Sequence, residues 1–116
     1  LTLPNTAIAA APIGPHDGWC DDAADPAYNR AVVLPYGASA EIMWRDDGLY
    51  DLLVTLGHND APPVAGRGSA IFLHCASLDV DGRLGPTEGC VALPRDTLLA
   101  LAPRLTADMM IEIRSD

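Results

Sequence analysis

Lysine is absent from the 116-residue chain, whose seven basic residues are all arginine. Sixteen Asp and Glu residues outnumber them and leave a formal net charge of −9 at pH 7. A chain this acidic repels phosphate backbones and anionic lipid headgroups. The composition therefore disfavours nucleic-acid binding and charge-driven membrane binding.

Long apolar runs are also missing, and none approaches the ~18 residues of a membrane span. The Ala-rich opening has prolines at positions 4, 12 and 15 and no basic residue, which is not typical of a signal peptide. Hydrophobic residues nevertheless make up 49% of the chain, and charged residues 20%. This length and composition predict a single folded domain over residues 1–116 rather than disorder.

Cysteine is scarce, with only Cys20, Cys75 and Cys90 in the chain. Because three is an odd number, at least one thiol stays unpaired within a single chain, and a disulfide framework is not expected. Cys20 follows Trp19 and is expected to pack in the core. An unpaired cysteine could instead have a chemical role as a reactive thiol.

Residues 1–48 are rich in turn-forming pairs and predict loops. Within them, residues 30–34 favour a short strand, and residues 39–45 favour either a strand or one or two helical turns. An irregular segment of this kind in a small domain either shapes a site or forms a surface arm. Both interpretations stay open at this point.

Residues 49–116 are more regularly patterned and are expected to hold the functional half of the domain. Residues 49–56 and 69–76 predict strands, and residues 94–105 predict a helix. Residues 109–113 predict a closing strand. The expected fold class is α+β, mainly β with one short helix.

The strand predicted over residues 69–76 divides its side chains between two faces. One face carries Ile71, Leu73 and Cys75, so the Cys75 side chain is expected in the core. The other face carries Ala70, Phe72 and His74. The helix predicted over residues 94–105 should start at Pro94, place Asp96 in its first turn and bury four leucines: Leu98, Leu99, Leu101 and Leu105.

His74 is followed sixteen residues later by Cys90, which Gly89 precedes in a tight turn. The thiolate is the reactive form of cysteine, and a nearby imidazole can take its proton. Gly89 lets the backbone approach a substrate closely, and amide groups at such a turn can stabilise an oxyanion by ~3–4 kcal/mol per donor. Spacing alone is weak support, because buried cysteines and core histidines are common.

Two segments, GSAIFLH (residues 68–74) and PTEGCVAL (residues 86–93), resemble the catalytic signature of the L,D-transpeptidase (YkuD-like) family. They are most similar to a branch that has nearly the same letters. Residues 13–30 and 49–60 also resemble that branch, so most of the chain is covered. The resemblance implies an L,D-transpeptidase-type β-sandwich.

The resemblance also implies residue roles. Cys90 would be the nucleophile and His74 its base, and the carbonyl of Cys75 would orient His74. Gly89 and the Cys90 amide would line the oxyanion site. Thr87 and Glu88 are either supporting residues of that site or ordinary turn residues.

The chain departs from the family at three places. Glu88 replaces the His that usually precedes Gly-Cys, and Ala92 replaces a frequent Arg or Asn. Nothing in residues 1–12 matches the strands that open the family domain, so the sheet could lack its N-terminal strands and expose an edge to a second copy of the chain. The candidates for substrate contacts are Trp19, Arg67, Ser69, Arg83 and Arg95.

The implied activity is cross-linking of peptidoglycan stem peptides through a cysteine thioester, without metal or organic cofactor. A cell-wall substrate implies the cell envelope. One alternative is an L,D-carboxypeptidase or amide hydrolase with the same Cys-His dyad. Another is an incomplete, non-catalytic domain that binds muropeptides. An activated Cys90 should react at lower pH than an ordinary thiol, whereas a packed thiol should resist.

Metal sites are not expected. His16 and His58 lack metal-site spacing, and residues 79–82 lack the third acidic ligand and the spaced Glu of a calcium loop, so a solvated turn is favoured there.

Overall fold

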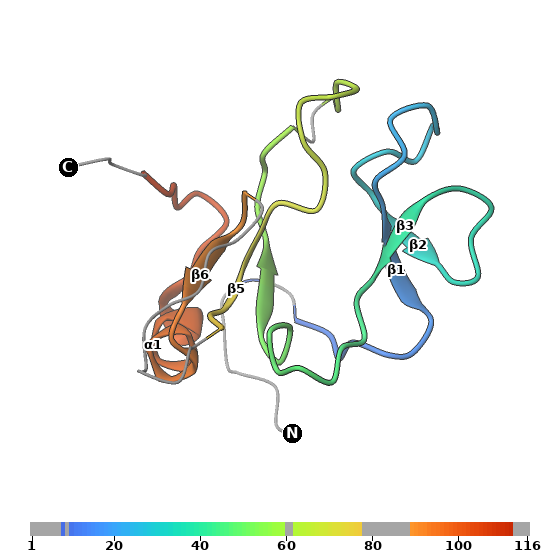
Figure 1. Ribbon diagram of the computed structural model, residues 1–116. Helices are drawn as coiled ribbons and strands as arrows, with labels where there is room; N and C mark the ends of the chain where they lie inside the picture. Colours follow the sequence, from blue (N-terminus) through green and yellow to red (C-terminus); the bar gives the residue numbers. More distant parts are fainter. Residues whose placement is uncertain (1–7, 9, 60–61, 78–88, 113–116) are drawn as a thin grey trace.

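The computed structural model describes residues 8, 10–59, 62–77 and 89–112 (Figure 1). These residues form two three-stranded sheets and one short helix, in an α+β arrangement that is mainly β. The predicted fold class is confirmed at this level. No helix in the described part of the chain is long and apolar enough to cross a membrane.

The first sheet comes from the segment that was predicted to be rich in loops. Its strands are β1 (Asp17–Cys20), β2 (Ala31–Val33) and β3 (Ala40–Ile42), in the order β2-β1-β3 with antiparallel pairing. β2 lies within the strand predicted over residues 30–34. β3 shows that residues 39–45 contain a strand rather than helical turns, and β1 was not predicted.

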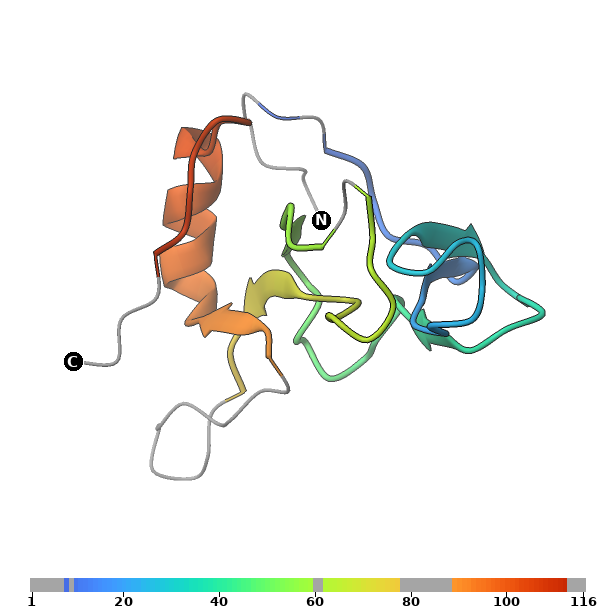
Figure 2. The same ribbon diagram turned by 90° about the horizontal axis from the view of Figure 1, so that it is seen from above.

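The second sheet has the order β4-β5-β6. Its strands are β4 (Leu53–Thr55), β5 (Phe72–Cys75) and β6 (Val91–Leu93). β4 and β5 are shorter than the strands predicted over residues 49–56 and 69–76, and β6 was not predicted. β4 and β5 are antiparallel, whereas β5 and β6 are parallel. Figures 1 and 2 show the two sheets side by side, with the helix α1 on the outer side of the second sheet.

The predicted alternation along β5 is confirmed, because its two faces contribute to different hydrophobic clusters. Phe72 and Ala70 pack with Met43 and Tyr50 between the two sheets. Trp19 of β1 joins this cluster through an edge-on contact with Phe72, with ring centroids 5.1 Å apart at 87°. Aromatic packing therefore connects the first sheet to the second.

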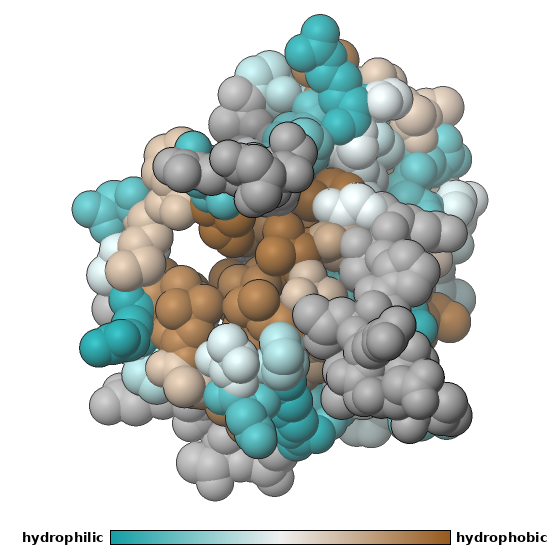
Figure 3. Space-filling view, turned by 60° about the vertical axis from the view of Figure 1, so that its left-hand side comes forward, coloured by the Kyte–Doolittle hydropathy of each residue, from teal (hydrophilic) through white to brown (hydrophobic). Residues whose placement is uncertain are grey.

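The other face of β5 supports α1. Leu73, Cys75 and Leu98 form its buried cluster, with half-buried aliphatic side chains around them. Figure 3, turned to bring the α1 side forward, shows apolar surface at the centre of this face. All three cysteines are free thiols, and Cys20 and Cys75 are buried, as expected for packing residues.

Helix α1 (Arg95–Leu101) is followed by a 3₁₀ turn at Ala102–Arg104, so the helical segment is close to the predicted one. Pro94 is the N-cap and not the first helical residue. The prediction that Leu99 is buried was wrong, because 43% of it is exposed. A seven-residue helix turns only a narrow stripe toward the sheet, and Leu98 occupies it.

The predicted closing strand over residues 109–113 was also wrong for the residues that the structure describes. Residues 109–112 form no strand, and Met109, Met110 and Ile111 are exposed. Apolar residues alone do not make a strand without an adjacent sheet edge to pair with. Residue 113 lies outside the described residues.

Leu98→Ala should lower the free energy of unfolding by about 3 kcal/mol, because it removes a fully buried side chain with which α1 packs against β5. Urea unfolding followed by circular dichroism would measure the change. The matched control is Leu99→Ala on the same helix, whose side chain is 43% exposed and should matter by less than about 1 kcal/mol. Equal losses in the two variants would contradict the described packing of α1.

Candidate active site

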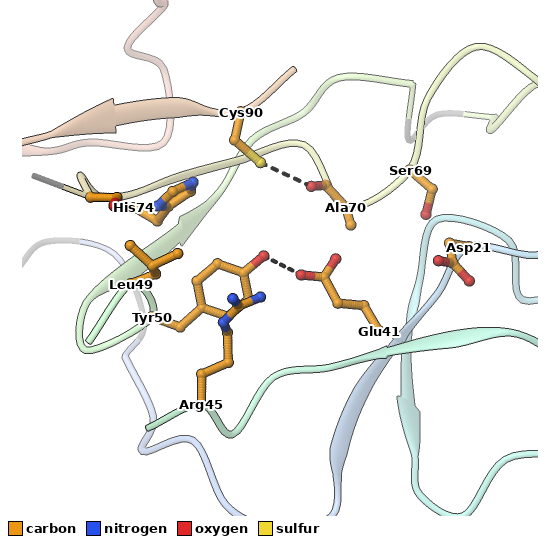
Figure 4. A pocket seen from close by; sticks show the side chains of 10 residues that line it. Asp21, Glu41, Arg45, Leu49, Tyr50, Ser69, Ala70, His74 and Cys90 are labelled. Atoms are coloured by element: carbon orange, nitrogen blue, oxygen red, sulfur yellow. Dashed lines mark hydrogen bonds between the residues drawn. The ribbon is translucent and has the colours of Figure 1, made fainter. Parts of the chain in front are cut away.

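A cavity of about 410 Å³ opens between the two sheets (Figure 4). The residues that line it come from segments far apart in the sequence. β3 and the loop after it supply one wall, and β5 with the residue preceding β6 supplies the other. Its polar and reactive lining residues include Glu41, Tyr50, Ser69, His74 and Cys90.

The pairing of β5 with β6 explains why His74 and Cys90 reach the same cavity. In this parallel pair, Leu73 lies opposite Val91 and His74 opposite Ala92. Cys90 precedes Val91, so its side chain points to the same face as Ala92 and His74. Figure 4 shows both side chains projecting into the cavity from adjacent strands.

The imidazole of His74 is buried and has a defined orientation. Only 5% of the residue is exposed, and Nδ1 lies 2.7 Å from the carbonyl oxygen of Cys75. A carbonyl can only accept a hydrogen bond, so Nδ1 carries the proton. Nε2 is then the ring nitrogen that can act as a base. The resemblance assigned this contact with His74 to the Cys75 carbonyl.

The Cys90 sulfur is held by the backbone of the segment that leads into β5. The thiol donates to the carbonyl oxygen of Ala70, with Sγ and O 3.2 Å apart, and Sγ accepts from the Phe72 amide at 3.3 Å. Cys90 is half-buried, so a ligand in the cavity can approach the sulfur.

Burial raises the pKa of the Cys90 thiol, and the negative charge of Glu41 raises it further. The hydrogen bond from the Phe72 amide opposes these effects but does not outweigh them. A raised pKa is the direction expected of a packed thiol rather than of an activated one. At neutral pH the thiol is protonated, and any nucleophilic role needs a base that takes the proton during attack.

Two residues beside the sulfur adopt left-handed backbone conformations. Ala70 has φ 59°, which is unfavourable for a residue with a Cβ by about 1 kcal/mol and turns its carbonyl toward the thiol. Gly89 has φ 97°, and a Cβ there would lie 3.2 Å from Cδ1 of Ile71. Glycine at position 89 is thus required by the backbone that presents Cys90.

The opposite wall of the cavity is polar and was not predicted from the sequence. Tyr50 donates its hydroxyl hydrogen bond to Glu41 of β3. The guanidinium carbon of Arg45 lies 5.1 Å from the centroid of the Tyr50 ring, and Arg45 is paired with Asp47 at 2.5 Å. Tyr50 falls within the 49–60 segment of the resemblance, which was the available signal.

The other candidate residues lie in different places. Ser69 lines the cavity, but its hydroxyl donates to the Cys20 carbonyl at 2.6 Å. Trp19 lines a separate depression between β1 and the end of β4, where its indole N–H donates to the side chain of Asn29 at 3.1 Å. Neither Trp19 nor Arg67 lines the cavity beside Cys90.

Three more of these candidates, Arg83, Thr87 and Glu88, lie outside the described residues. Arg95 forms an ion pair with Asp51. Within the described ranges, no three His, Cys, Asp or Glu side chains are grouped as a metal site would require.

Comparisons with known proteins give no family for this chain. No protein-family model, curated protein or solved structure matches it. The chemistry of the cavity therefore rests on its own geometry and on the motif resemblance, and the family assignment is a proposal.

The raised pKa of Cys90 predicts slow alkylation at neutral pH. Because only the thiolate reacts, the rate of iodoacetamide labelling at Cys90 should be lower than that of a free thiol at pH 7 and should keep rising above pH ~8.5. Peptide mapping would separate Cys90 from the buried Cys20 and Cys75. A rate that already reaches its plateau below pH 7 would contradict the prediction and indicate a preformed thiolate–imidazolium pair.

Proposed function

We propose that this protein is a cysteine acyltransferase of the L,D-transpeptidase type, with Cys90 as the nucleophile and His74 as its base. The observation that carries the proposal is the convergence of both side chains on one cavity. The proton on Nδ1 of His74 is held by the Cys75 carbonyl, which leaves Nε2 available as a base.

In the first step of the mechanism, the Cys90 thiol gives up its hydrogen bond to the Ala70 carbonyl. Nε2 of His74 accepts the proton of Cys90 while Sγ attacks a peptide carbonyl, forming a tetrahedral oxyanion beside the Cys90 amide. Collapse of the oxyanion breaks the peptide bond and gives a thioester. The departing amine takes the proton from His74. A second amine then attacks the thioester and loses a proton to Nε2 of His74. The C–S bond breaks, and the departing Cys90 thiolate takes that proton, so acyl transfer is complete and the thiol is restored.

The substrate class comes from the motif resemblance. It points to peptidoglycan stem peptides, in which the acyl group is an L-configured residue and the leaving group is a D-amino acid. The mainly β architecture is compatible with an L,D-transpeptidase-type β-sandwich. A substrate in the cell wall would place the protein in the cell envelope, and a homo-oligomer through an exposed sheet edge stays a prediction.

A second candidate function is binding of muropeptides without catalysis. The observation that favours it is the hydrogen bond of the thiol to the Ala70 carbonyl, beside burial that raises the pKa of Cys90. Such a domain would hold a stem peptide in the cavity without forming a thioester.

Covalent labelling by a carbapenem would separate these candidates, because the β-lactam carbonyl can acylate a catalytic thiol. The proposal predicts an adduct of one carbapenem per chain, located at Cys90 by peptide mapping. Absence of an adduct, or an adduct at Cys20 or Cys75 instead, would refute it.

The acceptor is identified with a stem tetrapeptide substrate. Release of the terminal D-residue together with a cross-linked dimer indicates an amine acceptor, as proposed. Release of the D-residue without the dimer indicates water, and the enzyme would then be an L,D-carboxypeptidase that uses the same two residues.

A further inference from the structure

Tyr50 is the side chain that faces the imidazole across the cavity. It is only 8% exposed, and its ring makes edge-on contacts with two residues of β5. The ring centroids are 5.4 Å apart for Tyr50 and His74, at an interplanar angle of 67°. For Tyr50 and Phe72 they are 5.9 Å apart at 87°. The imidazole is thus held at Nδ1 by the Cys75 carbonyl and at its ring by Tyr50.

Tyr50 is in turn anchored by the first sheet. Its hydroxyl donates to the carboxylate of Glu41 on β3, and Figure 4 shows the two side chains pointing toward one another. Arg45 lies over the ring at 5.1 Å, and its own charge is paired with Asp47. The ring therefore has a fixed place that depends on residues of the other sheet.

The charges around this pair keep the hydroxyl as a donor. The pKa of Tyr50 is raised well above its ordinary value, first by burial and then by the hydrogen bond to Glu41 and its negative charge. The positive charge of Arg45 opposes this only in part. Asp21 is the other acidic residue that lines the cavity. At every pH where the enzyme would work, Tyr50 is protonated and Glu41 can accept its hydrogen bond.

We propose that Tyr50, anchored by Glu41, is a positioning residue that holds the imidazole of His74 in line for proton transfer from Cys90. This inference rests on the proposed function. Proton transfer needs donor and acceptor at hydrogen-bond distance, and a displacement of about 1 Å can cost on the order of 10²-fold in rate. Without the hydrogen bond to Glu41, the Tyr50 ring could tilt and lose its edge-on contact with the imidazole of His74, which would then be held only at Nδ1.

Two conservative variants separate the effect of the hydrogen bond between Tyr50 and Glu41 from the effect of the negative charge of Glu41. Tyr50→Phe keeps the ring and removes the hydroxyl, so kcat should fall about tenfold with KM nearly unchanged. Glu41→Gln keeps an oxygen that can accept the Tyr50 hydrogen bond, so kcat should stay within about twofold to threefold. It also removes the charge that raises the pKa of Cys90, so the alkylation profile of Cys90 should move to lower pH.

A double-mutant cycle tests whether Tyr50 and Glu41 act together. Glu41→Ala removes the anchor and should lower kcat as much as Tyr50→Phe does. The double variant should lose little more than either single variant. Additive losses would show that the two side chains act independently and would overturn the inference. Urea unfolding of each variant shows that the comparison is made on folded protein.

A second readout does not depend on turnover. In ¹⁵N NMR spectra, His74 of the native chain should show the tautomer protonated at Nδ1, and Tyr50→Phe should give a mixture of tautomers or broadened signals. If the native chain does not transfer acyl groups but its His74 signals change in Tyr50→Phe, the proposed function fails and the positioning role stands. Native kcat together with unchanged His74 signals in Tyr50→Phe would overturn the positioning role.

Discussion

Cys90→Ala is expected to reduce acyl transfer to background, a loss of roughly 10⁴-fold or more. The variant removes the only sulfur that lines the cavity in the described part of the chain. Without it no thioester can form, whatever the remaining groups do. The measurement is the rate of D-residue release and dimer formation from a stem tetrapeptide, together with the loss of the carbapenem adduct.

The matched control is Cys75→Ala. Cys75 is buried, and its contribution to the site is its backbone carbonyl, which alanine retains. Cys75→Ala should therefore keep the hydrogen bond to His74 and most of the turnover, although the lost sulfur costs some stability. Undiminished turnover in Cys90→Ala would end the proposal that the thiol is the nucleophile.

Local pattern predicted two of the three strands of the second sheet, β4 and β5. The alternation along residues 70–75 assigned each side chain of β5 to the correct face, because a strand exposes successive residues to opposite sides. The same alternation placed His74 with Phe72, away from Cys75, and both clusters are present. Short buried strands with β-branched and aromatic residues carry this information in their own sequence.

The central strand of the first sheet, β1, could not be predicted in the same way, because long-range contacts determine it. Asp17-Gly18 is a turn-forming pair, yet both residues belong to β1. Gly18 is buried there, and a Cβ would lie 2.7 Å from a side-chain carbon of Leu34. The glycine thus serves close packing of the chain after β2 rather than a turn, which local propensity does not reveal.

The candidate site also has a part that the sequence indicates and a part that depends on long-range contacts. The Cys-His pair came from one continuous stretch, and the strand pairing of β5 and β6 brings the two residues to one cavity. The wall formed by Tyr50 and Glu41 depends on how the two sheets face each other. The sign of the pKa shift at Cys90 likewise depends on burial and on the approach of Glu41, neither of which the motif contains.

His74→Gln is expected to lower acyl transfer by about 10²- to 10³-fold at neutral pH, the usual contribution of a positioned general base. The variant keeps a side chain of similar size in a buried position but cannot take the thiol proton. The exposed His16 provides the matched control, and His16→Gln should leave the rate unchanged. Rates of both variants would be measured with the same stem tetrapeptide.

The pH dependence of that loss identifies the role of His74. Because the pKa of Cys90 is raised, the thiol is protonated at neutral pH and the base is needed there. As the pH rises through the pKa of Cys90, hydroxide removes the proton and the thiolate forms without His74. The defect of His74→Gln should therefore shrink at alkaline pH. A defect of constant size across this range would show that His74 acts in a step other than removal of the thiol proton, either in protonation of the departing amine or in substrate binding, because both persist after the thiol has ionised.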